Sequence, residues 1–218
     1  MSGHPAFKVC CIRSVDEAAL ALRAGAAALG LVSAMPSGPG VIGDERIREI
    51  AAWAPPVART FLLTARTGPE EIAAQVRAAG TDTVQLVDAV APASHRALRT
   101  LLPGVRLVQV IHVRGPASVD EALAAAATVD ELLLDSGNPF LAVKQLGGTG
   151  RVHDWSYSRR IVEAVGLPVW LAGGIGPDNA RAAIEAVGPH GLDVCSGLRV
   201  GGRLDPARLD AFAAAVRG

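Results

Sequence analysis

The chain has 218 residues, half of them hydrophobic, and its 21 basic and 21 acidic side chains give a formal net charge of zero. This balance argues against nucleic acid as a partner, because nucleic-acid-binding domains usually carry a basic surplus. No apolar run approaches the roughly 20 residues of a membrane-spanning helix, and the N-terminus lacks the features of a signal peptide. We therefore expect no membrane partner and a cytoplasmic location.

Short β-branched runs alternate along the chain with Ala-rich runs of helical period. The predicted strands span residues 7–12, 28–33, 58–64, 83–88, 106–113, 131–136, 168–173 and 191–196. The helices predicted to follow them span residues 15–24, 44–54, 69–79, 92–101, 118–128, 155–165, 178–187 and 205–217. Ser14 and Ser118 are predicted N-caps, since acidic residues follow each of them.

Eight such units favour parallel strands with right-handed crossovers, closed into a (β/α)8 TIM barrel. An open doubly wound sheet usually has a Gly-rich first turn, whereas here the first turn is Arg13-Ser14-Val15-Asp16. No linker interrupts the pattern, so residues 1–218 are predicted to form a single domain. In this architecture the active site lies at the C-terminal ends of the strands.

The three cysteines show neither a zinc-type spacing nor a disulfide framework, so we expect no metal site and no disulfide. Cys10 and Asp135 end the first and sixth predicted strands, on different sides of the barrel mouth. An acid and a base facing each other across a substrate suit an aldose–ketose rearrangement. The alternative for Cys10 is core packing, because a free cysteine is often buried. Asp135 follows three leucines, where a carboxylate is rarely buried without a purpose.

The ends of the last two predicted strands are rich in small residues, with Gly173 and Gly174 after the seventh and Ser196 and Gly197 after the eighth. Such loops let backbone N–H groups approach a phosphate, which predicts a phosphate site there. The alternative is that these glycines only relieve crowding where a strand turns into a helix.

Seven sequence blocks, in order and at the right spacing, resemble the phosphoribosylanthranilate isomerase family of tryptophan biosynthesis. The blocks are Lys8-Val9-Cys10-Cys11-Ile12, Ala24-Gly25-Ala26, Val84-Gln85-Leu86, Leu133-Leu134-Asp135-Ser136, Gly147-Gly148-Thr149-Gly150 with Asp154-Trp155, Ala172-Gly173-Gly174-Ile175 with Asp178-Asn179, and Gly191-Leu192-Asp193-Val194 with Ser196-Gly197. The resemblance covers nearly the whole chain and implies a (β/α)8 enzyme that carries out an Amadori rearrangement.

By this resemblance, Asp135 would be the general acid that opens the sugar ring, and Cys10 the general base that removes the C2 proton. Gly147, Gly148 and Thr149 would join the phosphate loops in binding a phosphorylated sugar substrate. Lys8, Gln85, Asp178 and Asn179 would be further substrate residues. The resemblance implies no cofactor and no metal, and no oligomeric state is predicted.

The chain departs from the family pattern on the side of the site that would face the aryl group. Gly40 stands where the family has an arginine, and Val87 where it has a histidine. Arg66, Arg114 or Arg199 are candidates to replace the lost arginine, the alternative for each being a solvated surface residue. Cys11, at a family glycine, is expected to be a small packing substitute.

These departures leave two alternatives to an authentic phosphoribosylanthranilate isomerase. The first is a diverged Amadori isomerase that acts on another phosphoribosyl amine. The second is a non-catalytic barrel subunit, which the retention of both Cys10 and Asp135 disfavours.

Overall fold

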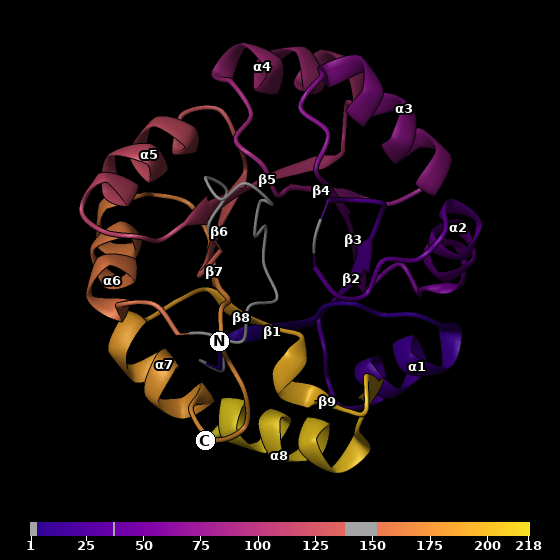
Figure 1. Cartoon of the computed structure of the whole chain (residues 1–218), viewed down its shortest axis with the longest axis vertical. Helices are drawn as coiled ribbons and strands as arrows, with labels where there is room; N and C mark the ends of the chain where they lie inside the picture. The colour runs from indigo at the N-terminus through magenta and orange to yellow at the C-terminus, as the bar shows by residue number, and fades with distance from the viewer. Residues whose placement is uncertain (1–3, 37, 138–151) are drawn as a thin grey trace.

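The structure, a computed structural model, describes residues 4–36, 38–137 and 152–218. Eight parallel strands close into a barrel, and eight helices surround it (Figure 1). The strands are β1 (Ala6–Val9), β2 (Ala28–Val32), β3 (Arg59–Thr64), β4 (Thr83–Leu86), β5 (Arg106–His112), β6 (Glu131–Asp135), β7 (Val169–Leu171) and β8 (Gly191–Val194). The helices are α1 (Val15–Arg23), α2 (Asp44–Trp53), α3 (Pro69–Ala79), α4 (Pro92–Leu101), α5 (Ala117–Ala126), α6 (Trp155–Ala164), α7 (Ala180–Val187) and α8 (Pro206–Arg217). The predicted (β/α)8 barrel is confirmed.

Barrel closure depends on the pairing of the first strand with the last. β1 pairs with β8 in parallel, with Lys8 opposite Asp193 and Val9 opposite Val194. β1 is shorter than predicted because Cys11 has a φ of 62°, a left-handed conformation that extended strands do not contain.

Side chains alternate between two cores, as the pleat of a strand requires. One face of each strand packs against the surrounding helices. The other face fills the barrel with residues that include Phe61, Val110, Leu133 and Trp170. Side chains two positions further along the same strands therefore stand on the inner face at the barrel mouth.

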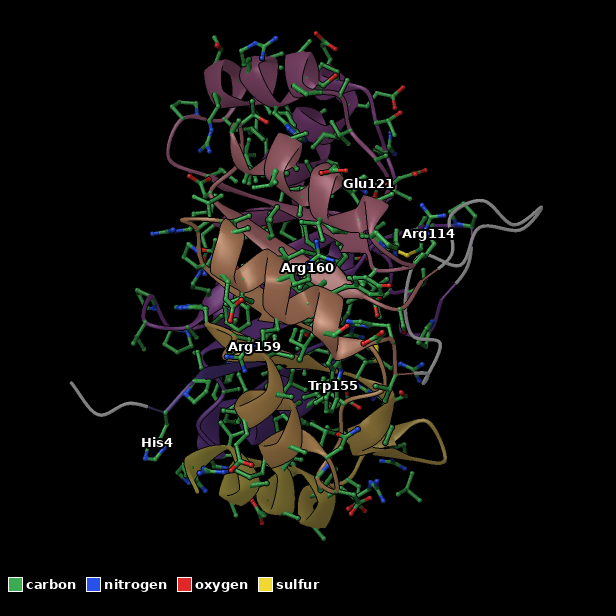
Figure 2. All side chains as sticks on the ribbon, turned by 90° about the vertical axis from the view of Figure 1, so that its left-hand side faces the viewer. His4, Arg114, Glu121, Trp155, Arg159 and Arg160 are labelled. Atoms are coloured by element: carbon green, nitrogen blue, oxygen red, sulfur yellow. A yellow bond between two sulfur atoms is a disulfide. The ribbon has the colours of Figure 1, made fainter. Side chains whose placement is uncertain are left out.

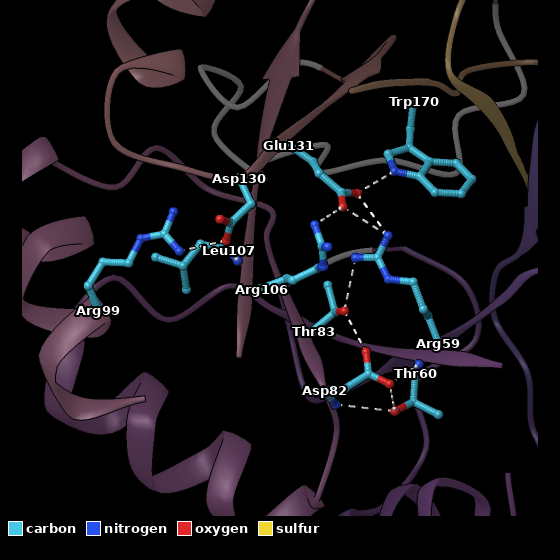
Figure 3. A network of polar contacts seen from close by, with 10 residues as sticks. All are labelled: Arg59, Thr60, Asp82, Thr83, Arg99, Arg106, Leu107, Asp130, Glu131 and Trp170. Atoms are coloured by element: carbon cyan, nitrogen blue, oxygen red, sulfur yellow. Dashed lines mark hydrogen bonds and ion pairs between the residues drawn. The ribbon is translucent and has the colours of Figure 1, made fainter. Parts of the chain in front are cut away.

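A polar network closes the opposite end of the barrel (Figure 3). Glu131 is buried and forms ion pairs with Arg59 at 2.9 Å and with Arg106 at 3.2 Å. The indole N–H of Trp170 donates a hydrogen bond to Glu131 Oε2 at 2.7 Å. These contacts lie at the N-terminal ends of the strands. Residues at this end of a (β/α)8 barrel contribute to stability rather than to catalysis.

The chain after β8 forms elements that the sequence pattern did not predict. A 3-10 helix, η1 (Ser196–Leu198), leads into an antiparallel hairpin of β9 (Arg199–Val200) and β10 (Arg203–Leu204).

The two predicted N-caps have different outcomes. The Ser14 hydroxyl caps α1 by accepting from the Glu17 N–H. The cap at Ser118 is wrong, because α5 begins earlier and Ser118 donates to the carbonyl of His112 instead. Among the described helices, none combines the length and the apolar character needed to cross a bilayer.

Candidate active site

The predicted catalytic residues converge at one end of the barrel. Figure 2 shows Arg114 and Trp155 toward this end of the molecule, with His4 toward the other. Cys10 follows β1 directly, and Asp135 is the last residue of β6. Both lie on strand ends that point into the barrel mouth, as predicted.

Asp135 is a buried carboxyl group whose ionised form is disfavoured by burial. Its side chain is 7% exposed, and burial raises the pKa of Asp135 to about 6. The Ser136 N–H, at 2.7 Å from Oδ1, and the Lys8 ammonium oppose this shift, whereas the negative charge of Asp193 adds to it. A carboxylic acid whose pKa is raised in this way can donate a proton near neutral pH.

Cys10 is a buried free thiol. Burial raises the pKa of Cys10 to about 11, and the charges of Asp193 and Asp135 add to the increase, although Lys8 opposes it. A thiol acts as a base only as the thiolate. The predicted base therefore starts from the protonated state in the substrate-free site.

Lys8 and Asp193 form an ion pair inside the barrel, with Lys8 Nζ 2.8 Å from Asp193 Oδ1. Lys8 is fully buried, and its charge acts on both Cys10 and Asp135. The predicted contact of Lys8 with the substrate stays a prediction. What the position of Lys8 shows is an influence on the charges of the acid and the base from within the core.

A pocket of about 230 Å³ opens beside the ends of β7 and β8. Its lining consists of Gly174, Ile175, Gly176, Asp178, Asn179, Ser196, Gly197 and Arg208. Three of the four predicted phosphate-loop residues are in this lining. Backbone groups of two loops, together with one guanidinium, are suited to a phosphate group.

The neighbouring predicted residues shape the pocket. Gly173 has a φ of 84°, and a Cβ there would lie 2.8 Å from Ser136 Oγ, so it lets the loop pass close to the end of β6. Asn179 accepts from the Gly176 N–H at 2.9 Å and donates to the Gly174 carbonyl at 3.0 Å. Asn179 thus holds the loop in shape, whereas Asp178 is exposed at the pocket edge.

The remaining predicted site residues divide into two groups. Gln85 is buried on β4, and its Oε1 has no hydrogen-bond partner among the residues that the structure describes. Gly147, Gly148 and Thr149 lie outside the residues that the structure describes.

The cysteine prediction is wrong, because Cys11 and Cys195 form a disulfide with their Cα atoms 6.0 Å apart. The two residues are 184 positions apart in sequence and adjoin the ends of β1 and β8. No local spacing could reveal this pair, since only barrel closure brings these strands together. Cys11 is therefore more than a packing substitute.

The position of Cys11 also explains why no side chain is present at position 40. Gly40 has a φ of 83°, and a Cβ there would lie 2.8 Å from Cys11 Sγ. The arginine of the family pattern is thus incompatible with Cys11 in this conformation.

The three candidate replacement arginines are all engaged with carboxylates. Arg199 is almost fully buried and pairs with Glu17 at 3.0 Å, so it is not the solvated surface residue that we considered. Arg199 also donates to the carbonyl oxygen of Cys11. Arg66 lies 3.7 Å from Glu71, and Arg114 lies 3.6 Å from Glu121.

Two further residues of the mouth, Arg208 and His112, are not predicted from the sequence. Arg208 enters the pocket from α8, and its Nε donates to the Gly197 carbonyl at 2.7 Å. His112 ends β5 opposite Asp135 of β6. The position of His112 at a strand end could have predicted a place in the site, whereas nothing in the sequence marked Arg208, because it lies inside a helix.

In the described part of the chain, no group of three or more His, Cys, Asp and Glu residues could hold a metal ion.

A closed parallel barrel with a buried acid, a thiol and a small-residue pocket at its mouth defines the class of (β/α)8 enzymes that act on phosphorylated small molecules. The family model described as "N-(5'phosphoribosyl)anthranilate (PRA) isomerase" matches residues 7–215. The chain belongs to the phosphoribosylanthranilate isomerase family.

Individual relatives agree with this assignment. The N-(5'-phosphoribosyl)anthranilate isomerase of Moorella thermoacetica is 39% identical over 213 residues, which are 96% of this chain and 88% of that protein. A second such isomerase, from Methanosarcina mazei, is 37% identical over 88% of this chain and 85% of its own length. The structure of the enzyme from Thermus thermophilus superposes with a TM-score of 0.81 at 27% identity, covering 96% of this chain and 97% of that one.

Proposed function

We propose that this chain isomerises N-(5'-phosphoribosyl)anthranilate to 1-(carboxyphenylamino)-1-deoxyribulose 5-phosphate. The observation that carries the proposal is the buried pair of Asp135 and Cys10 at the ends of β6 and β1, next to the pocket at β7 and β8. The substrate's phosphate would occupy that pocket and extend the sugar across the barrel mouth. The aminobenzoate group would then lie toward the loop after β2.

Asp135 opens the sugar ring in this mechanism. Its carboxylic acid protonates the ring oxygen, the bond from C1 to that oxygen breaks, and the amine nitrogen forms a double bond to C1. The raised pKa of Asp135, about 6, makes the proton available near neutral pH.

Cys10 then acts as the base. Its thiolate removes the proton from C2, and the electron pair moves toward the nitrogen to give an enolamine. The enolamine gains a proton at C1 and loses the one on its C2 hydroxyl, so the product is an isomer of the substrate. No external oxidant or reductant takes part.

The protonation states of Asp135 and Cys10 in the free enzyme determine which fraction of the protein can react. The productive state has Asp135 protonated and Cys10 ionised, with pKa values of about 6 and about 11. It carries the same number of protons as the dominant state but is much less populated, because the pKa of the acid lies below the pKa of the base. The active fraction is therefore nearly constant between these two pKa values.

The remaining assignments complete the proposal. Gly174, Ser196 and Gly197 would contact the phosphate directly, with Gly147, Gly148 and Thr149 as predicted additions from the preceding loop. Residues 1–218 act as one domain in the cytoplasm, where the Cys11–Cys195 disulfide is an exception to the usual reduced state of cysteines. A diverged isomerase for another phosphoribosyl amine is the second candidate, favoured by Gly40 at the position of the family's arginine.

A direct assay tests the proposal. Freshly generated phosphoribosylanthranilate is mixed with the protein, and the loss of substrate fluorescence is followed beside the Cys10→Ser and Asp135→Asn variants. We expect turnover by the wild type and a loss of most turnover in each variant. Full activity in either variant would contradict the mechanism. A folded wild type that does not turn over this substrate would favour the second candidate.

A further inference from the structure

His112 is a buried imidazole at the mouth of the barrel that the mechanism above does not use. Its side chain is 6% exposed, and the register places it opposite Asp135 on the neighbouring strand. Val110 and Leu133, two positions earlier on the two strands, both belong to the core inside the barrel. His112 therefore stands on the inner face beside the proposed general acid.

The hydrogen bonding of His112 determines its tautomer. Nε2 lies 3.0 Å from the carbonyl oxygen of Val87, and a carbonyl only accepts. Nε2 must therefore carry the hydrogen. Burial lowers the pKa of His112, although the Val87 carbonyl and Asp88 oppose this shift, so the ring stays neutral near pH 7. Nδ1 is then a bare lone pair.

This lone pair has no partner among residues 4–36, 38–137 and 152–218. Within that part of the chain, Nδ1 of His112 is buried and makes no hydrogen bond. Buried polar atoms in folded proteins are nearly always satisfied, and an orphan at an active-site mouth needs a physical reason. A donor on a bound ligand would satisfy it.

We propose that His112 Nδ1 accepts a hydrogen bond from the bound substrate, either from a sugar hydroxyl or from the arylamine N–H. This role rests on the proposed function and adds a specificity-determining residue to it. A neutral acceptor beside Asp135 would orient the sugar so that its ring oxygen meets the acid. The Val87 carbonyl contributes by holding the tautomer that leaves Nδ1 free.

The competing explanation is that His112 only braces the ends of β4 and β5 through Val87. Two variants separate these roles because each preserves one half of the imidazole. Asn places an amide oxygen near the position of Nδ1 but loses the reach to Val87. Gln extends an N–H₂ group toward the Val87 carbonyl but offers no acceptor at the position of Nδ1.

If His112 binds substrate, His112→Gln lowers kcat/KM by about 10- to 100-fold, as expected for a lost ligand contact that leaves a donor unpaired. The kcat/KM of His112→Asn then stays within a few fold of the wild-type value. A large loss of kcat/KM in His112→Asn with little loss in His112→Gln would overturn the proposal. His112 would then only hold the ends of β4 and β5 together.

A spectroscopic readout decides the case in which both variants lose activity. The ¹⁵N resonance of Nδ1 in the wild type should move upfield when the enzyme is saturated with substrate and product, and should stay in place with inorganic phosphate alone. An unchanged resonance under saturation would overturn the proposal. Absence of turnover by the wild type would overturn the proposed function instead, so the two failures are distinguishable.

Discussion

Lys8 and Asp193 form an ion pair across the seam where the first and last strands of the barrel meet, with 2.8 Å between Nζ and Oδ1. The pair lies two residues before Cys10 on one strand and two before Cys195 on the other. Lys8 lowers the pKa values of both Cys10 and Asp135, and Asp193 raises both. The two partners therefore have opposite effects on the proposed acid and base.

The first prediction uses these opposite effects. Asp193→Asn should move both limbs of the pH profile of kcat/KM to lower pH, whereas Lys8→Met should move both to higher pH. The measurement is the pH–rate profile together with titration of the Cys10 thiol. If the pH limbs of both variants shifted in the same direction, the opposite electrostatic effects of Lys8 and Asp193 would be contradicted. Asp193→Asn should also destabilise the fold by about 3 to 5 kcal/mol, since it leaves a buried ammonium unpaired.

The second prediction concerns the cost of keeping Asp135 buried. The pKa of Asp135 is about 6 in the fold, against an ordinary value of 3.8, so folding favours the protonated form. This contribution to stability is present below about pH 4 and is lost as the pH rises through about 6. The loss amounts to about 3 kcal/mol at neutral pH.

Asp135→Asn should therefore be more stable than the wild type at pH 8 and nearly equal to it at pH 4, while turnover is lost. Urea unfolding of both proteins at the two pH values measures the difference. Asn can still accept from the Ser136 N–H, so the local backbone contact is kept. Equal stability of the two proteins at pH 8 would show that ionised Asp135 is not costly.

The third prediction concerns the Cys11–Cys195 disulfide, which closes a loop of 184 residues. In the chain-entropy model such a cross-link contributes about 5 kcal/mol, as an upper bound. Dithiothreitol should therefore lower the Tm of the wild type, while Cys195→Ser should have a low Tm that dithiothreitol does not change. Alkylation under denaturing conditions should find one thiol before reduction, Cys10, and three after it. Three reactive thiols before reduction would rule out the bridge.

The fourth prediction concerns the conflict between Cys11 and a side chain at position 40. Gly40→Arg should destabilise the protein and lower its activity, because its Cβ would meet Cys11 and the backbone φ is 83°. Cys11→Gly suits the left-handed conformation at position 11 and removes the two closest contacts, those with Cβ and Sγ of Cys11. In a double-mutant cycle, the cost of Gly40→Arg should be smaller in the Cys11→Gly background. Additive effects would contradict direct contact.

The fifth prediction concerns the charge of the phosphate pocket. Arg208 is the cationic side chain in its described lining, so Arg208→Gln should weaken binding of inorganic phosphate about 10-fold or more. Gln can still donate to the Gly197 carbonyl, so the loop keeps its support. Arg217→Ala, on the same helix but bonded to the Ala24 carbonyl, is the matched control and should bind phosphate normally. Isothermal titration calorimetry measures all three proteins, and equal affinities would exclude Arg208.

The sequence alone determined the alternation of elements and therefore the barrel, because each strand and helix is encoded by local periodicity and turn residues. It also determined that Cys10, Asp135 and the small residues after β7 and β8 meet at one end, since parallel strands in a closed barrel all finish there. The family resemblance rested on these same blocks.

Only the tertiary structure decided which side chains touch. The Cys11–Cys195 bridge and the Lys8–Asp193 pair both depend on the register in which β8 closes against β1, and no local pattern encodes that register. The free lone pair of His112 depends on the Val87 carbonyl of a neighbouring strand. Burial raises the pKa of Cys10, whereas the proposed chemistry needs this pKa to be low. The sequence does not predict this shift, because desolvation depends on the whole packed barrel and not on the neighbouring residues in the chain.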